Sequence, residues 1–258
     1  MTELLHVDDH DGDHAGVRVL TIDRPEAKNA MNPPLRAALV AAFAAADADD
    51  AVRAVVLTAV DPVFSAGVDF KQVERASDGT SVASGPVDNP AAVLRRVSKP
   101  VLAAVNGACV SGALEVALSA SFVVASERAR FADTHALLGV SPTWGLTALL
   151  PRAVGVRKAR EMSLTGNFVA AEEALRIGLV AHVVPHDELL GFTMSLAQRI
   201  PGNAAVGDML ELYRQGEDLS LADALATEAA MGANRKVDLS AFTAAGSAAA
   251  ARQRKDTE

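Results

Sequence analysis

Short apolar runs, each followed by a turn, organise the first half of the chain. Residues 17–23 alternate in polarity and are rich in branched side chains, which is typical of a strand. Two further runs, 54–60 and 101–105, are almost continuously apolar, as expected for strands covered on both faces. Shorter runs at 122–125 and 129–132 predict two more strands.

Helical patterns alternate with these strands. Two prolines at 33 and 34 can start an alanine-rich helix over 35–48, and shorter helices are predicted over 91–97 and 112–119. The strand–turn–helix order occurs three times in the first 135 residues and predicts an α/β fold with parallel strands. Residues 77–90, rich in Gly, Ser, Asp and Pro, predict a surface loop. The pattern after residue 143 is mostly helical, with breaks at Gly155, Gly166, Gly178, Pro185 and Pro201.

Composition excludes several classes of function. The 258 residues are half apolar and carry a formal charge of −8, which argues against general nucleic-acid binding. Cys109 is the single cysteine, so an internal disulfide is impossible. The start of the chain lacks a secretory pattern, and no apolar run reaches the ~18 residues of a membrane span. We therefore expect a soluble, cytoplasmic protein with no membrane partner.

Acidic residues and histidines crowd the segment 6–14. Its composition suits metal binding, but the residues follow no ligand spacing. A solvated acidic hairpin before the first strand is the preferred interpretation, and no metal is expected.

Two glycine-bearing turns follow buried strands and carry the candidate chemistry. They span 64–71 and 106–115. Glycine lets backbone N–H groups point at a ligand, and two such groups from different turns make an oxyanion hole, which the dipole of a helix starting near Gly112 would strengthen. Glu115 follows Gly112 by three residues, so both share one helix face and the carboxylate is placed to move a proton beside a carbonyl. Spacing alone also allows Glu115 to be a surface acid of a first helical turn.

The two turns together resemble the enoyl-CoA hydratase/isomerase, or crotonase, family. The resemblance covers most of the chain apart from the acidic start and the last ~25 residues. Its segments are 24–25, 29–32, 64–71, 105–107, 112–115, Phe131, 138–139, Pro142, Gly145, 164–166 and 178–180.

This resemblance implies an α/β fold of the crotonase/ClpP-like type, a spiral of β-β-α units with a helical C-terminal region. Residues 1–195 would form the core with the coenzyme A and oxyanion sites, and 196–258 a helical region for oligomerisation and a pocket lid. A homotrimer or a dimer of trimers is expected. Coenzyme A would enter as part of an acyl-CoA substrate, with no separate cofactor.

The resemblance also assigns residues. Val68 and Gly112 would supply the two oxyanion-hole N–H groups, and Glu115 would be the principal acid/base. The coenzyme A and substrate site would include Lys28, Ala30, Ala66, Asp69, Phe70, Lys71 and Trp144. Lys28 and Lys71 are candidate phosphate partners, with a solvated surface lysine as the alternative for each.

Position 135 departs from the family pattern. Hydratases of this family use a second glutamate there, and this chain has His135. Imidazole can act as an acid or a base near neutral pH, so His135 is a candidate catalytic residue, with a pocket-lining histidine as the alternative. If residues 133–135 lie on a strand, Asp133 shares a face with His135 and can orient it.

Four functions stay open on the sequence. Hydration of a 2-enoyl-CoA is preferred, and enoyl-CoA isomerisation is the first alternative because one carboxylate can move a proton between two carbons. A hydrolase using Ser111 and His135 is a weaker alternative, since it leaves Glu115 idle. A non-catalytic acyl-CoA binder is the last.

Overall fold

The computed structural model describes residues 4–69, 89–235 and 243. The chain divides into two compact units, Met1–Leu210 and Glu211–Glu258. The first unit contains both sheets and the candidate site. The predicted boundary at residue 195, and the role of the C-terminal helices, stay predictions.

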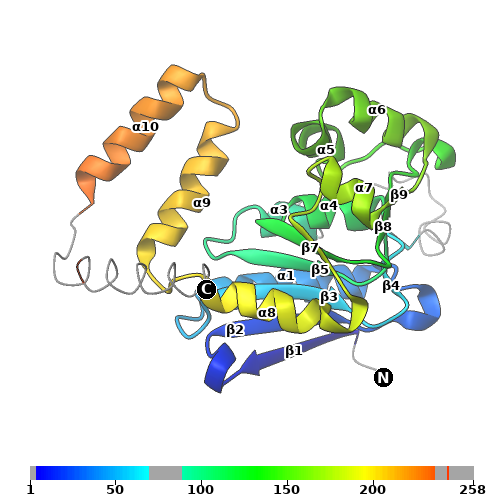
Figure 1. Cartoon of the computed structure of the whole chain (residues 1–258), viewed down its shortest axis with the longest axis horizontal. Helices are drawn as coiled ribbons and strands as arrows, with labels where there is room; N and C mark the ends of the chain where they lie inside the picture. Colours follow the sequence, from blue (N-terminus) through cyan, green and yellow to red (C-terminus); the bar gives the residue numbers. More distant parts are fainter. Residues whose placement is uncertain (1–3, 70–88, 236–242, 244–258) are drawn as a thin grey trace, which may run out of the picture. The chain divides into compact units, whose positions relative to one another are not determined.

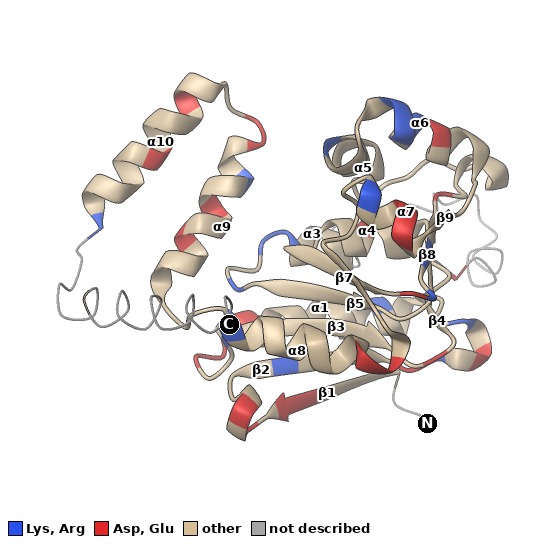
Figure 2. Ribbon diagram, viewed as in Figure 1, with Lys and Arg blue, Asp and Glu red and all other residues tan. Residues whose placement is uncertain are grey.

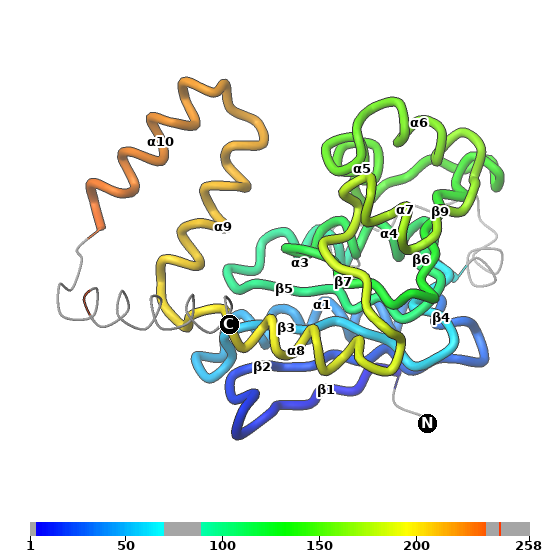
Figure 3. The backbone as a smooth tube through the Cα atoms, viewed as in Figure 1, coloured from blue at the N-terminus to red at the C-terminus, as the bar shows by residue number. Residues whose placement is uncertain are grey.

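A six-stranded sheet forms the centre of the first unit (Figures 1 and 3). Its order is β1 (Leu5–His10), β2 (Val17–Ile22), β3 (Ala54–Ala59), β5 (Val101–Val105), β7 (Phe122–Ser126) and β10 (His182–Val184). β1 pairs antiparallel with β2, and all other neighbours are parallel. The predicted strands at 17–23, 54–60, 101–105 and 122–125 are therefore confirmed within one residue.

A smaller sheet contains β4 (Val63–Ser65), β6 (Ala108–Val110), β8 (Arg130–Ala132) and β9 (Val169–Ala170). Each of β3, β5 and β7 continues directly into a strand of this second sheet, and β6 leads into a helix. The architecture is thus the expected α/β spiral of β-β-α units. The segments 64–71 and 106–115 are predicted as turns throughout, which is wrong because β4 overlaps the first and β6 lies within the second. Three-residue strands are too short to show an alternating pattern.

The helices of the first unit cover the larger sheet on both faces. Alternate side chains of β2, β3 and β5 pack on α8 (Leu189–Arg199), and the others pack on α1 (Pro33–Ala48) and α3 (Pro90–Leu94). Because both faces of β3 and β5 are covered, their sequences are almost continuously apolar. Asn32 caps α1 by accepting a hydrogen bond from the Leu35 N–H at 2.9 Å.

The remaining helices follow the predicted breaks. They are α4 (Gly112–Leu118), α5 (Leu146–Val154), α6 (Val156–Thr165), α7 (Ala171–Arg176), α9 (Ala204–Gly216) and α10 (Leu221–Asn234). Short 3₁₀ helices occupy Gly12–His14, Pro25–Ala27, Ala136–Leu138 and His186–Glu188. The C-terminal half also contains β9 and β10, which the helical pattern did not predict. The predicted loop at 77–90 lies outside the described residues as far as residue 88.

The acidic start of the chain is an edge strand. β1 carries acidic residues beside β2, as Figure 2 shows. Arg18 on β2 donates two hydrogen bonds to the Asp9 carboxylate at 2.6 and 2.8 Å, and these lower the pKa of Asp9. The acidic segment therefore forms a hairpin together with the predicted strand at 17–23, and not a separate hairpin before it as expected. None of the described helices is long and apolar enough to cross a membrane.

Candidate active site

The two glycine-bearing turns lie against each other in the structure. A Cβ atom built on Gly67 would lie 3.2 Å from the Gly112 nitrogen and 2.8 Å from the Val110 carbonyl oxygen. A Cβ atom on Gly112 would lie 3.4 Å from the Val68 nitrogen. Gly67 also has a φ of +92°, which L side chains rarely adopt. Glycine at both positions therefore permits the close approach of the Val68 and Gly112 amides.

The N–H groups of Val68 and Gly112 donate no hydrogen bond to any described residue. The Gly67 carbonyl accepts from the Met31 N–H at 2.7 Å, and the Ser111 carbonyl accepts from the Glu115 N–H at 3.0 Å. A trans peptide directs its N–H away from its carbonyl, so the Val68 and Gly112 N–H groups point away from those partners. Among the described residues, neither amide has an acceptor. Both remain able to bind an anionic oxygen.

Ser111 sets the direction of the Gly112 amide. Its φ of +50° is uncommon for a residue with a side chain. The Ser111 hydroxyl oxygen accepts from the Thr134 N–H at 2.9 Å and lies 2.8 Å from the Thr134 hydroxyl. These contacts hold the strained residue, and within the described chain the Ser111 hydroxyl has no hydrogen bond to His135. The Ser–His pair that a hydrolase would need is not formed.

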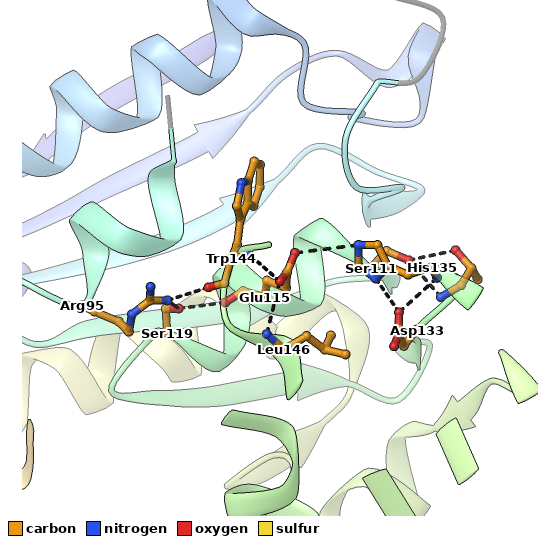
Figure 4. Close-up of polar contacts among 9 residues, drawn as sticks. Arg95, Ser111, Glu115, Ser119, Asp133, His135, Trp144 and Leu146 are labelled. Atoms are coloured by element: carbon orange, nitrogen blue, oxygen red, sulfur yellow. Dashed lines mark hydrogen bonds and ion pairs between the residues drawn. The ribbon is translucent and has the colours of Figure 1, made fainter. Parts of the chain in front are cut away.

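Glu115 lies on α4 and is 1% exposed (Figure 4). Its Oε1 accepts hydrogen bonds from the Trp144 N–H at 2.7 Å and the Leu146 N–H at 3.2 Å. Burial raises the pKa of Glu115, and the two backbone hydrogen bonds only partly oppose this. Glu115 is thus a buried acid that holds its proton to a higher pH than a solvated glutamate. A surface acid, the alternative that spacing allowed, is excluded.

His135 faces the other carboxylate oxygen of Glu115. The His135 Nε2 lies 3.9 Å from Glu115 Oε2, and the His135 Nδ1 lies 2.6 Å from Asp133 Oδ1. Burial raises the pKa of Asp133, but hydrogen bonds from His135 and Ser163 outweigh it, and the net pKa is lowered. An ionised Asp133 accepts from Nδ1–H, so a neutral His135 presents a bare Nε2 toward Glu115.

The predicted pairing of Asp133 with His135 is confirmed, although its expected basis is wrong. β8 ends at Ala132, and His135 has helical backbone angles, so the pair does not lie on a strand. The Asp133 carboxylate also accepts from the His135 backbone N–H at 3.1 Å. A local turn therefore brings the two side chains together.

Comparison with known proteins now identifies the family. A sequence model described as enoyl-CoA hydratase/isomerase matches residues 12–238. The chain belongs to this family. A probable peroxisomal enoyl-CoA hydratase of Arabidopsis thaliana is 35% identical over 215 residues, which are 83% of this chain and 80% of the relative.

Solved structures of the enoyl-CoA hydratase/isomerase family match the fold as well. A crystal structure of an enoyl-CoA hydratase from Mycobacterium avium has a TM-score of 0.73 at 42% identity, covering 84% of this chain and 89% of that one. A monofunctional enoyl-CoA isomerase from M. smegmatis also has a TM-score of 0.73, at 33% identity, covering 87% of this chain and 99% of that one. The fold thus occurs with both activities among the relatives.

The segment that the family resemblance assigns to coenzyme A is folded around Arg24. Arg24 Nη1 donates to the Ala30 carbonyl at 2.8 Å and to the buried Asp69 carboxylate at 2.6 Å. The Ala66 N–H donates to the Lys28 carbonyl at 3.0 Å, which ties the two parts of the segment together. Lys28 itself is exposed.

Other residues near the predicted site have different positions. Trp144 is buried, and its Cζ3 would lie 3.4 Å from a Cβ atom on Gly112, so the indole covers that turn. Phe70 and Lys71 lie outside the described residues. The sequence assigned no role to Thr134, Arg24 or Leu146, because their contacts join segments that are distant along the chain.

Proposed function

We propose that this chain hydrates the double bond of a 2-enoyl-CoA thioester. The observation that carries the proposal is the pair of Glu115 and His135, whose Oε2 and Nε2 atoms lie 3.9 Å apart. Glu115 lies on α4, the helix that begins at Gly112. The N–H groups of Val68 and Gly112 would donate hydrogen bonds to the thioester oxygen and stabilise the negative charge that develops on it.

The two side chains divide the proton transfers. A water placed about 2.8 Å from both Glu115 Oε2 and His135 Nε2 satisfies ordinary hydrogen-bond distances. His135 takes one proton of the water through its bare Nε2, and the water oxygen bonds to the β-carbon. The π electrons move onto the thioester oxygen as an enolate. Protonated Glu115 then gives its proton to the α-carbon, and proton exchange between His135 and Glu115 restores the starting state.

Isomerisation is the second candidate because relatives of this chain include a monofunctional enoyl-CoA isomerase. In that reaction Glu115 alone would remove a proton from one carbon of a 3-enoyl thioester and return it to another. His135 would then only keep the carboxylate in place.

Turnover with two substrates distinguishes the candidates. The parent chain, Glu115→Gln and His135→Ala are each assayed with short and long 2-enoyl-CoA and with 3-enoyl-CoA. Hydration requires that the parent adds water to a 2-enoyl thioester and that both variants lose most of this activity. A parent that only converts 3-enoyl substrates supports isomerisation. Tight acyl-CoA binding without turnover of either substrate would support a non-catalytic acyl-CoA binder.

We also infer that the chain works as a homotrimer or a dimer of trimers in the cytoplasm. The second unit supports self-association because Tyr213, Leu221 and Leu225 are large apolar side chains exposed on α9 and α10. Sedimentation velocity on the full chain would test this, since a monomer at micromolar concentration contradicts it.

A further inference from the structure

Arg95 joins three segments that meet at Glu115 (Figure 4). It follows α3, and its Nη1 donates to the Trp144 carbonyl at 2.8 Å and to the Ser119 hydroxyl at 2.9 Å. The Ser119 hydroxyl donates its own proton to the Glu115 carbonyl at 2.8 Å. Each donor in this chain of hydrogen bonds has a defined acceptor. Arg95 therefore connects the far end of α4 with the turn 144–146.

The turn 144–146 is the element that holds the Glu115 side chain. Its two N–H groups, from Trp144 and Leu146, are the hydrogen-bond donors to Glu115 Oε1. Trp144 is thus held from two sides, by Glu115 at its N–H and by Arg95 at its carbonyl. Gly145 has a φ of +119°, and a Cβ atom there would lie 3.3 Å from the Arg95 Nη1. The guanidinium therefore packs directly against this turn.

We propose that Arg95 is a positioning residue for Glu115. By holding the turn 144–146 it keeps both N–H groups on Oε1, which leaves Oε2 directed at His135. The consequence for turnover rests on the proposed function, whereas the consequence for the Glu115 carboxyl group does not.

The pKa of Glu115 reports on this positioning. The groups that act on it are His135, the ionised Asp133 and the two N–H donors of the turn, with burial as the largest influence. The N–H donors stabilise the carboxylate and so lower its pKa. If the turn loosens, these hydrogen bonds weaken and the pKa of Glu115 rises further.

The test compares variants that separate geometry from charge. Arg95→Met removes the hydrogen bonds and the charge. Arg95→Lys and Ser119→Ala keep the charge but disturb the bridge, because an ammonium group is not a planar fork and alanine removes one acceptor. Arg96→Met is the matched control. Arg96 is exposed, and its substitution removes the same charge one residue away from Arg95.

Two measurements are made on each full-length variant. The pKa of Glu115 is followed by NMR of ¹³C-labelled glutamate carboxyl groups, with the signal assigned by its loss in Glu115→Gln. The kcat and KM for a 2-enoyl-CoA are measured in parallel. We expect a higher Glu115 pKa in Arg95→Met, Arg95→Lys and Ser119→Ala, with kcat about tenfold lower in Arg95→Met and KM little changed. Arg96→Met should match the parent.

Two results would overturn the proposal. A Glu115 pKa that is unchanged or lower in all three variants shows that the turn does not depend on Arg95. A rise in Arg95→Met alone shows an effect of charge rather than of positioning. If the parent turns over no enoyl-CoA, the proposed function fails, but the pKa comparison still decides the role of Arg95. Should Arg95→Met not fold, the two charge-preserving variants give the answer.

Discussion

Replacing Glu115 by glutamine removes the proposed acid and leaves its surroundings in place. The glutamine carbonyl can occupy the position of Oε1 and keep the hydrogen bonds from the Trp144 and Leu146 N–H groups. The amide nitrogen then replaces Oε2, facing His135 at about the same separation. The fold and the Arg95 bridge should therefore survive the substitution, while proton transfer through this side chain is lost.

The size of the effect follows from this change. General acid–base catalysis contributes about 10²- to 10⁴-fold, so kcat/KM of Glu115→Gln should fall by about 10³-fold, equivalent to about 4 kcal/mol of transition-state stabilisation. The free energy of unfolding of Glu115→Gln, by contrast, should be higher than that of the parent. Because burial raises the pKa of Glu115 in the folded state, ionisation of Glu115 lowers stability as the pH rises through that pKa. A neutral glutamine avoids this loss.

The assay measures activity and stability on the same samples. Hydration is followed by the loss of enoyl-thioester absorbance, and unfolding by the thermal midpoint Tm between acid and neutral pH. Glu115→Gln should have a higher Tm than the parent at pH values above the folded pKa of Glu115 and a similar Tm at acid pH. Glu127→Gln, at an exposed position, is the control and should match the parent in both. A kcat/KM of Glu115→Gln within threefold of the parent would refute the catalytic assignment.

Three further substitutions test the other parts of the site. Asp133→Asn should lower kcat by about 100-fold with little change in KM, because an amide can present an N–H and reverse the imidazole tautomer; steady-state kinetics would show an unchanged kcat if this is wrong. Gly67→Ala should abolish turnover and lower the unfolding free energy by about 1–3 kcal/mol, whereas Gly12→Ala, also at positive φ but in open space, should lose stability without losing activity. Equal activity losses in the two glycine variants would contradict the role of the close contact. Ser111→Ala should lower the free energy of unfolding by about 1 kcal/mol, because the hydrogen bonds with Thr134 are lost. The variant should keep at least about a tenth of the parent's hydration rate. A complete loss of turnover in that variant would favour the hydrolase.

Local patterns of the sequence predict much of the architecture. The apolar runs of β3 and β5 identify strands covered on both faces, and Pro33 after Asn32 identifies the start of α1. The two glycine-bearing turns and the position of Glu115 are also readable, because each depends on neighbouring residues. The local patterns do not predict the short strands β4, β6, β9 and β10, since two or three residues show no periodicity.

The chemical state of the site depends on tertiary contacts. The donors to Glu115 lie 29 and 31 residues away along the chain, and Arg95 reaches Trp144 across 49 residues. No local pattern encodes these separations. Burial of Glu115 likewise arises only when α4 packs against the turn 144–146, and burial is what raises its pKa. The sequence by itself determined which groups are present, whereas the folded chain decided their distances, their exposure to water and therefore their protonation.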